Sequence, residues 1–439
     1  MELKKGSRVF LEDMRPVKVT KQLGSGGQGA VYQALCGEEK RALKWYFARR
    51  LRNREKFREN LRQNILDGAP SGHFLWPLAM VSDRGGDFGY LMDLRPRGFA
   101  DFSDVLNNRA AFKSLDAAVL CALNIVAGFK ALHRAGKSYQ DLNDGNFFVN
   151  PATGAVLICD NDNVAPDGEN LGIGGKPGYM APEVVRGQAK PGTLTDQHSL
   201  AVVLFKLFMR HDPLMGRAFV QSVCITEAAE RRLYGDSPVF IFDPCDASNR
   251  PVPGIHANPL RLWPLFPPYI RQAFERSFCR GMKDPAARLT EHEWQKLLVR
   301  LRGEILSCGC GAQFFAAQVR AEVKNGMFAC PGCGAPQAFP ALLRIKDMPV
   351  HLGAGSRLYA CHTDIDSGDF ACETGRVLGK GGAGAPLRLR NTSQEPWLRT
   401  DPGGPPVRPG GSCVIRPGMT LRFHGVTGTI TMNNTEDGQ

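Results

Sequence analysis

Two polar side chains five residues apart, those of Asp141 and Asn146, carry the clearest sign of chemistry in this sequence. A carboxylate in such a loop can orient a substrate hydroxyl, and a carboxamide five residues later can bind a metal ion that accompanies a nucleotide. The pair lies in a polar stretch that leads into an apolar run at 147–149. The spacing therefore predicts a site for phosphoryl transfer, in which Asp141 is the catalytic carboxylate.

A glycine-rich segment precedes this pair by more than a hundred positions. Gly24, Gly26 and Gly29 form a G-x-G-x-x-G pattern, which by itself also occurs in dinucleotide-binding folds and ordinary turns. The residues that follow, 30–32, are typical of a strand and not of a helix. This context favours a hairpin that covers phosphates, where glycine lets the backbone approach closely.

Lys44 lies within the apolar strand-like run 41–46. A lysine in such a strand is costly unless it has an anionic partner. We expect that partner to be the nucleotide phosphates together with a helix carboxylate, for which Glu59 is the first choice and Glu55 the alternative. The competing interpretation is a surface lysine whose stem lies along apolar surface.

A second strand, 156–159, ends at Asp160, with Asp162 two residues later. Carboxylate and amide oxygens suit a hard cation, so we predict a magnesium or manganese site formed by Asn146 and Asp160. Asp162 either assists a second metal ion or caps a turn.

The apolar strand 89–94 is the candidate hinge that reads the adenine edge. The family resemblance that the later motifs carry implies the following ATP-binding residues: Gly24, Gly26, Gly29, Val31, Ala42, Lys44, Met92, Asp93, Leu94 and Phe148.

The length and composition define the elements that must position these residues. At 439 residues, with 43% hydrophobic and 22% charged residues, the chain is expected to form two or three globular domains. The longest apolar stretch, 200–209, is short and contains Lys206, and the N-terminus has no apolar signal region. We therefore expect a soluble cytoplasmic protein that has no membrane partner.

Further motifs in the order of the chain identify a family resemblance. The segment 178–183 ends in Ala-Pro-Glu, Asp196 follows it, and Arg288 lies in a late Asp-Pro-Ala-Ala-Arg motif. Together with the preceding motifs, residues 16–302 resemble a eukaryotic-type (Hanks-type) Ser/Thr protein kinase. The resemblance implies a bilobal α+β fold, ATP as cofactor and a protein substrate. It also implies that Asp196 anchors the catalytic loop and that Arg288 pairs with Glu183.

Two departures from the family pattern concern the activation loop. The usual His-Arg before the catalytic aspartate is replaced by Tyr139 and Gln140, so a phosphorylated loop residue has no standard cation to bind. The segment 160–183 contains no serine or threonine, and Tyr179 is its only hydroxyl-bearing residue. We therefore predict that the enzyme is not activated by Ser/Thr phosphorylation of this loop.

Another departure concerns the charge beside the transferred phosphoryl group. Asn143 stands where Ser/Thr kinases carry a lysine, and Lys176 stands where they usually carry threonine. We hypothesise that Lys176 reaches into the site as a third catalytic residue and replaces the missing charge. The alternatives are a surface lysine at this position and, for the whole chain, a pseudokinase scaffold that binds nucleotide without transfer.

Paired cysteines follow the kinase-like region. Closely spaced thiolates backed by glycines suit tetrahedral zinc, so residues 305–340 are predicted to form a zinc-ribbon-like module with four structural ligands. These ligands are Cys308, Cys310, Cys330 and Cys333. Residues 345–439, rich in glycine and proline with short alternating runs, are predicted to form a small all-β domain. The predicted kinase domain is 1–304, with an N-lobe at about 1–94 and a C-lobe at about 95–304.

This module order resembles bacterial kinases encoded with a von Willebrand A-domain protein and a metal-dependent protein phosphatase. The resemblance implies a signalling circuit with those partners.

A basic stretch, 49–62, is either a solvated helix face or a docking face for an acidic protein. No aromatic residues interleave with its charges, so nucleic acid is not indicated as a partner. For the β domain we favour a packing or docking role over phosphopeptide recognition by Arg388, Asn391, Ser393 and Trp397.

Overall fold

Alternating buried and exposed side chains build a strand-rich lobe from the first part of the chain. In β2, for example, Val17 and Val19 are buried and Lys18 between them is exposed. Six strands close into a barrel in the order β1-β2-β3-β4-β6-β5, with helix α1 packed against it. The bounds are β1 Arg8–Leu11, β2 Pro16–Ser25, β3 Gly29–Cys36, β4 Glu39–Tyr46, α1 Arg54–Asp67, β5 Ala79–Ser82 and β6 Phe88–Met92.

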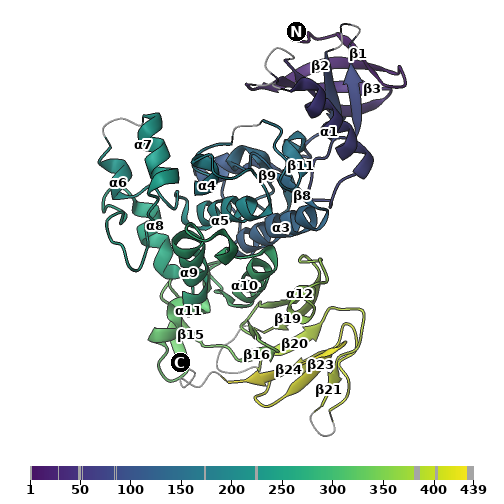
Figure 1. Cartoon of the computed structure of the whole chain (residues 1–439). Coiled ribbons are helices and arrows are strands. Elements are labelled where there is room, and N and C mark those ends of the chain that lie inside the picture. The colour runs from purple at the N-terminus through teal and green to yellow at the C-terminus, as the bar shows by residue number, and fades with distance from the viewer. Residues whose placement is uncertain are drawn as a thin grey trace.

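This computed structural model describes residues 2–27, 29–47, 51, 53–83, 85, 87–172, 175–222, 226–379, 386–400 and 404–432. Figure 1 shows the strand-rich lobe in purple, a helical lobe in teal and green, and a β domain in yellow on the far side of the helical lobe.

The helical lobe is built on two long apolar helices, α3 (Leu115–Arg134) and α5 (Thr193–Met209), joined by α10 (Glu291–Gly303) in one continuous hydrophobic core. Ser114 caps α3 by accepting a hydrogen bond from the amide of Ala117. In the described part of the chain, α3 is the one helix long and apolar enough to cross a membrane, and 61% of its apolar window is buried inside this lobe. The remaining helices are α2 Phe102–Leu106, α4 Pro182–Val185, α6 Arg217–Val220, α7 Glu227–Arg231, α8 Ala257–Leu262 and α9 Pro268–Glu275.

Short strands packed on the core of the helical lobe carry the loops that the sequence singles out. β9 pairs with β10 and β7, and β8 pairs with β11. The polar loop that contains Asp141 lies between β8 and β9, and Asp160 follows β10. The bounds are β7 Ala100–Asp101, β8 Lys137–Tyr139, β9 Phe147–Val149, β10 Val156–Ile158 and β11 Val164–Pro166.

Two small hairpins follow α10. The first pairs β12 (Ile305–Ser307) with β13 (Gln313–Phe315), and the second pairs β14 (Met327–Ala329) with β15 (Pro336–Ala338). Between them lie the short helix α11 (Ala316–Val319) and a core of only six buried residues, which includes Phe314 and Phe328.

The C-terminal region is a two-sheet β domain with its own core. Leu343, Leu389 and Leu421 are fully buried in that core. One sheet has the order β17-β16-β24-β23-β21 and the other β18-β19-β20-β22. The bounds are β16 Leu342–Ile345, β17 Met348–His351, β18 Arg357–Tyr359, α12 Ala360–Thr363, β19 Glu373–Leu378, β20 Arg388–Asn391, β21 Leu398–Arg399, β22 Ser412–Val414, β23 Thr420–Phe423 and β24 Val426–Thr431.

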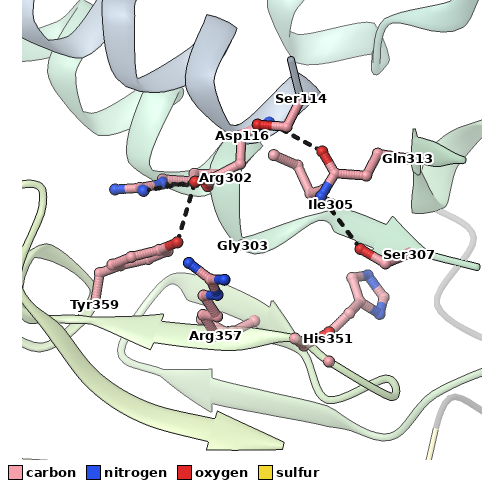
Figure 2. Close-up of a pocket in the computed structure, with 13 residues that line it drawn as sticks. Ser114, Asp116, Arg302, Gly303, Ile305, Ser307, Gln313, His351, Arg357 and Tyr359 are labelled. Carbon is pink, nitrogen blue, oxygen red and sulfur yellow. Dashed lines mark hydrogen bonds and ion pairs between the residues drawn. The ribbon is translucent and has the colours of Figure 1, made fainter. Parts of the chain in front are cut away.

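The β domain is attached to the helical lobe through a buried arginine. Arg302 of α10 donates to both carboxylate oxygens of Asp116 at 2.7 and 3.0 Å, and the hydroxyl of Tyr359 donates to the same carboxylate at 3.1 Å. These three side chains line a polar cavity of about 250 Å³ between α3, α10 and the β domain (Figure 2). A Cβ on Gly303 would lie 2.4 Å from the carbonyl oxygen of Pro349, so this contact requires glycine.

Candidate active site

Lys44 of β4 lies in the cleft between the lobes and contacts two carboxylates. Its ammonium nitrogen is 3.2 Å from Asp160 Oδ1, and 2.8 and 2.9 Å from the two oxygens of Asp162. Burial by itself would lower the pKa of Lys44, but the charges of Asp160 and Asp162 raise it above its ordinary value. The lysine therefore stays protonated, as a group that binds phosphate must.

The helix carboxylates predicted as partners of Lys44 lie elsewhere, which corrects that prediction. Glu55 and Glu59 are both exposed, and Glu59 is 3.7 Å from Arg62. The side of α1 that faces the protein is formed by Phe57, Leu61 and Asn64. The orientation of α1 about its own axis thus places both glutamates on its solvent side. The carboxylates beside Lys44 come from the segment after β10.

Asp162 also takes a different place from the one predicted. Its side chain has no exposed surface, and both of its oxygens accept hydrogen bonds from Lys44 and from two tyrosine hydroxyls. A metal ion would have to displace these donors. Asp160, by contrast, is 42% exposed on its side chain and lines the cavity between the lobes. The structure thus separates the two carboxylates into one that faces the cleft and one that is enclosed.

The loop with Asp141 is held by its own amides. The side chain of Asn143 donates to Asp141 Oδ1 at 3.2 Å, and the backbone amide of Asn143 donates to Asn146 Oδ1 at 2.8 Å. Burial raises the pKa of Asp141 above its ordinary value, which makes the carboxylate a better proton acceptor. Asn146 is buried in η2 (Asp144–Asn146), so its position is fixed by the turn.

Tyr139 connects this loop to the segment that carries Asp160. Its hydroxyl donates to the carbonyl oxygens of Cys159 and Asp160, the latter at 3.1 Å. Asp160 has a φ of 56°, a left-handed conformation that a residue other than glycine rarely adopts. The buried tyrosine thus replaces the usual histidine and fixes the backbone that aims Asp160.

Asp196 anchors the loop from beneath, in the position that the resemblance implies. Its carboxylate accepts the backbone amide of Tyr139 at 2.6 Å and lies 3.0 Å from His133 Nε2. His133 Nδ1 is 3.0 Å from Glu291 of α10. Burial tends to lower the pKa of His133, but the two carboxylates raise it to about 9, so the ring is a cation between two acids.

A cavity of about 480 Å³ lies beside Asp160, between the glycine-rich hairpin and the helical lobe. Seven of the predicted ATP-binding residues line it: Gly24, Val31, Ala42, Met92, Asp93, Leu94 and Phe148. Sequence reasoning missed the other lining residues, Leu23, Leu75, Arg95, Asp101 and Cys159. No motif marks these positions, and they reach the cavity only through the fold.

The remaining predicted glycines have different environments. A Cβ on Gly26 would meet nothing within 4 Å, so its side of the hairpin is open. A Cβ on Gly29 would lie 2.2 Å from the carbonyl oxygen of Trp45. Gly29 therefore permits β3 to pack against β4. Gly26, Gly29 and Lys44 lie outside the lining of the cavity itself.

Lys176 lies beside the catalytic loop. Its ammonium group donates to Asp144 Oδ1 at 2.7 Å, and its side chain is 55% exposed. Its backbone amide hydrogen-bonds to Asp141 and thereby lowers the pKa of that carboxyl, against the larger effect of burial. The lysine is thus close to the site and bound to the loop, while its proposed action on a phosphoryl group remains a prediction.

Glu183 and Arg288 form the ion pair that the resemblance implies. The guanidinium of Arg288 donates to the two carboxylate oxygens at 2.7 and 2.8 Å, and also to the carbonyl oxygens of Gly281 and Leu194. Arg288 is only 2% exposed. This bidentate pair joins the end of the activation loop to the base of the helical lobe.

The four predicted zinc ligands converge. The sulfur atoms of Cys308, Cys310, Cys330 and Cys333 all lie within 4.8 Å of one another. The distances are 3.7 Å from Cys308 to Cys333 and 3.9 Å from Cys310 to Cys330. Zinc–sulfur bonds of about 2.3 Å give tetrahedral edges of about 3.8 Å, so this arrangement fits zinc with no open position.

Structural contacts account for some of the residues considered for docking. In the basic stretch, Arg49, Arg50 and Arg52 lie outside the described residues, and Arg58 stacks on the ring of Phe88. In the β domain, the fully buried Asn391 donates to the carbonyl oxygens of Glu395 and Val407, and Trp397 is buried in the core. These contacts explain Asn391 and Trp397 without a phosphopeptide.

Comparisons with known proteins agree with this geometry. Residues 17–234 match the family model described as protein kinase domain. The chain is 25% identical over 207 residues to rhodopsin kinase GRK1 of Rattus norvegicus, covering 44% of this chain and 36% of that protein. It is 30% identical over 128 residues to the probable serine/threonine-protein kinase CCRP1 of Zea mays, covering 28% and 20%. The chain thus spans about a third of the first relative's length and about a fifth of the second's.

Among solved structures, the kinase domain of Mycobacterium tuberculosis PknI matches with a TM-score of 0.43 and 20% identity, over 68% of this chain and 98% of that chain. Over residues 17–234, just under half of the chain, the match to the protein kinase domain model agrees with the order of the motifs found there.

Proposed function

Since residues 17–234 match the protein kinase domain model, we propose that the protein is an ATP-dependent Ser/Thr protein kinase. The observation that carries this proposal is the contact of Lys44 with Asp160, beside the loop that holds Asp141 and Asn146. Lys44 and Asp160 are in contact although 116 positions separate them, and Tyr139 joins the Asp141 loop to Asp160. A pseudokinase under no demand for catalysis would not have to keep all four groups.

Each residue has a defined part in the proposed reaction. The cavity beneath the glycine-rich hairpin takes the nucleotide, with Ala42 and Phe148 among the residues that enclose its base. Lys44 binds the phosphates, and Asn146 and Asp160 hold magnesium or manganese, which neutralises charge on the phosphate oxygens. Asp141 orients the acceptor hydroxyl and receives its proton, as its raised pKa favours.

The finer assignment rests on the sequence resemblance. We propose a cytoplasmic bacterial signalling kinase that phosphorylates proteins on serine or threonine and also itself. The von Willebrand A-domain protein and the metal-dependent phosphatase are its proposed partners, because the order of kinase, zinc module and β domain resembles the kinases encoded with them. The four-cysteine module has a structural role, since no coordination position is left open for substrate.

Transfer of labelled γ-phosphate from ATP tests this function. The full chain should label itself or added protein substrates, and mass spectrometry should find phosphoserine or phosphothreonine. Asp141→Asn should reduce labelling by about 10³-fold or more, since it removes the catalytic carboxylate. The matched control is Asp347→Asn, an exposed aspartate in the β16–β17 turn, which should retain full activity. A folded wild-type protein that binds ATP but labels nothing would establish the pseudokinase alternative.

A further inference from the structure

The second carboxylate of the metal-binding segment, Asp162, is enclosed between the lobes. It lies in the short 3-10 turn η3 (Asn161–Asn163), and its side chain has no solvent-exposed surface. An ionised carboxylate in such a place is destabilising unless each oxygen is paired. Asp162 meets this condition fully, because its Oδ1 lies 2.8 Å from Lys44 and 3.0 Å from Tyr90, and its Oδ2 lies 2.9 Å from Lys44 and 2.8 Å from Tyr46.

The pleat of the barrel explains why these three donors meet at one point. Lys44 and Tyr46 are two residues apart on β4, so their side chains lie on the same face of the sheet. Tyr90 of β6 is the antiparallel partner of Lys44 in register. Burial raises the pKa of both tyrosines well above the ordinary value, so both hydroxyls remain protonated and donate to the carboxylate.

Helix α1 contributes no charge to this group of residues. It contacts Tyr46 through the ring of Phe57, edge to face, with centroids 5.1 Å apart. Asn60 and Asn64 both donate to the carbonyl oxygen of Val164, at 2.8 and 2.9 Å. In the described part of α1 both glutamates are exposed, so the helix packs beside the lysine without pairing with it.

We propose that Asp162 is the positioning residue for Lys44 and serves as its permanent counter-ion in place of a helix carboxylate. This inference rests on the proposed kinase function. The two carboxylates then have different roles. Asp160 is accessible and can leave Lys44 to bind a metal ion, whereas Asp162 stays with the lysine when nucleotide binds. The orientation of Lys44 is then set by β4, β6 and η3, and α1 does not control it through charge.

The test compares full-length Asp162→Asn with Glu59→Gln and Glu55→Gln. Asp162→Asn keeps the shape of the side chain and removes its charge. We expect kcat/KM for ATP to fall about 10²-fold, since the lysine is no longer held in place, while both glutamate variants stay within twofold of wild type. The double variant Tyr46→Phe/Tyr90→Phe keeps the charge but loosens the carboxylate, and it should give a smaller loss in the same direction.

A second readout is independent of catalysis. Removing the carboxylate takes away the acceptor that holds the Lys44 ammonium group at 2.8 and 2.9 Å, so an amine-directed acylating reagent should modify Lys44 at least tenfold faster in Asp162→Asn than in wild type at pH 8. A purely structural role would change the melting temperature without selectively changing the reactivity of this one lysine. If Asp162→Asn does not fold, the double tyrosine variant carries the same two measurements.

The outcomes separate this inference from the proposed function. Unchanged kcat/KM and unchanged Lys44 reactivity in folded Asp162→Asn would overturn the positioning role while leaving the kinase function intact. A loss with Glu59→Gln equal to that with Asp162→Asn would also overturn it, as would a gain in activity, which would mark Asp162 as an inhibitory clamp. If the wild type transfers no phosphate, the kinase proposal fails, and the labelling rates still report whether Asp162 holds Lys44.

Discussion

The carboxamide oxygen of Gln140 accepts a hydrogen bond from the backbone amide of Leu171 at 2.9 Å, and its amide nitrogen donates to the carbonyl oxygen of Glu169. A neutral side chain thus holds the activation loop at the position where related kinases carry an arginine. Both hydrogen bonds join the Gln140 side chain to backbone groups of the loop, and neither requires an added phosphate. Tyr179, the one hydroxyl-bearing residue of segment 160–183, is only 1% exposed.

The first prediction is that the kinase is active without loop phosphorylation. Protein treated with a phosphatase and then purified should transfer phosphate at the rate of untreated protein. Gln140→Ala should lower kcat about tenfold or more, because two backbone groups of the loop lose their partner. Kinetic assays on both proteins, with phosphosite mapping, check this, and an essential phosphotyrosine at position 179 would contradict it.

The second prediction concerns Lys176, which we expect to neutralise charge on the transferring phosphoryl group. Lys176→Thr should reduce kcat about 10²-fold with little change in ATP binding, because the charge acts mainly in the transition state. Lys190→Thr, a change of an exposed lysine in the following loop, is the matched control. Steady-state kinetics separate the two effects, and unchanged turnover in Lys176→Thr would end the hypothesis.

The third prediction concerns the buried ion pair of Glu183 and Arg288. Glu183→Gln leaves the 2%-exposed Arg288 without its counter-charge and should lower the free energy of unfolding by about 3–5 kcal/mol. Asp13→Asn breaks the exposed pair with Arg15 and should leave the urea midpoint unchanged. Urea titrations of the three proteins give the comparison, and equal midpoints for both variants would show that the buried pair contributes nothing.

The fourth prediction follows from His133, whose pKa is raised to about 9 between Asp196 and Glu291. A histidine with a raised pKa in the folded state stabilises fully below its unfolded value of 6.5, and this stabilisation is lost as the pH rises through about 9. The free energy of unfolding should therefore decrease by roughly 3 kcal/mol between pH 6.5 and 9.5 from this residue.

His133→Gln should flatten that dependence. His198 provides the control, because burial lowers its pKa to about 3 and it is neutral throughout this range. His198→Gln should leave the slope between pH 6.5 and 9.5 as in the wild type. Urea unfolding at several pH values measures the slopes, and identical slopes for wild type and His133→Gln would disprove the assignment of a protonated His133.

The fifth prediction is that the four cysteines bind one zinc ion that folds the small hairpins. Metal analysis should give about one equivalent of zinc, and a strong chelator should expose four additional reactive thiols. Because the core of this module has only six buried residues, we expect its hairpins to unfold without the metal. Nucleotide binding should persist, and a metal-free protein with protected thiols would contradict the site.

Local sequence was sufficient for the parts of the site that lie within one short loop. The spacing of Asp141 and Asn146, the glycine pattern and the Cys pairs each occupy a few consecutive residues, so the covalent chain constrains their geometry. The fold class of the kinase domain also follows from the order of its motifs, and the match over 17–234 agrees with it. The two β-sheets of the last region follow the expected alternation, although their order could not be read from it.

Only the tertiary structure decided which carboxylate pairs with Lys44. The sequence offered Glu59 and Glu55 as its partners, with Asp162 placed at a second metal ion or a turn, and the apolar positions of α1 did not fix its rotation. Asp162 lies 118 positions from Lys44, and the choice depends on how α1, β4 and η3 approach one another in space. A buried charge without a partner is costly, so Lys44 pairs with the carboxylate that is buried beside it. Which groups are buried together depends on the packing of the whole molecule.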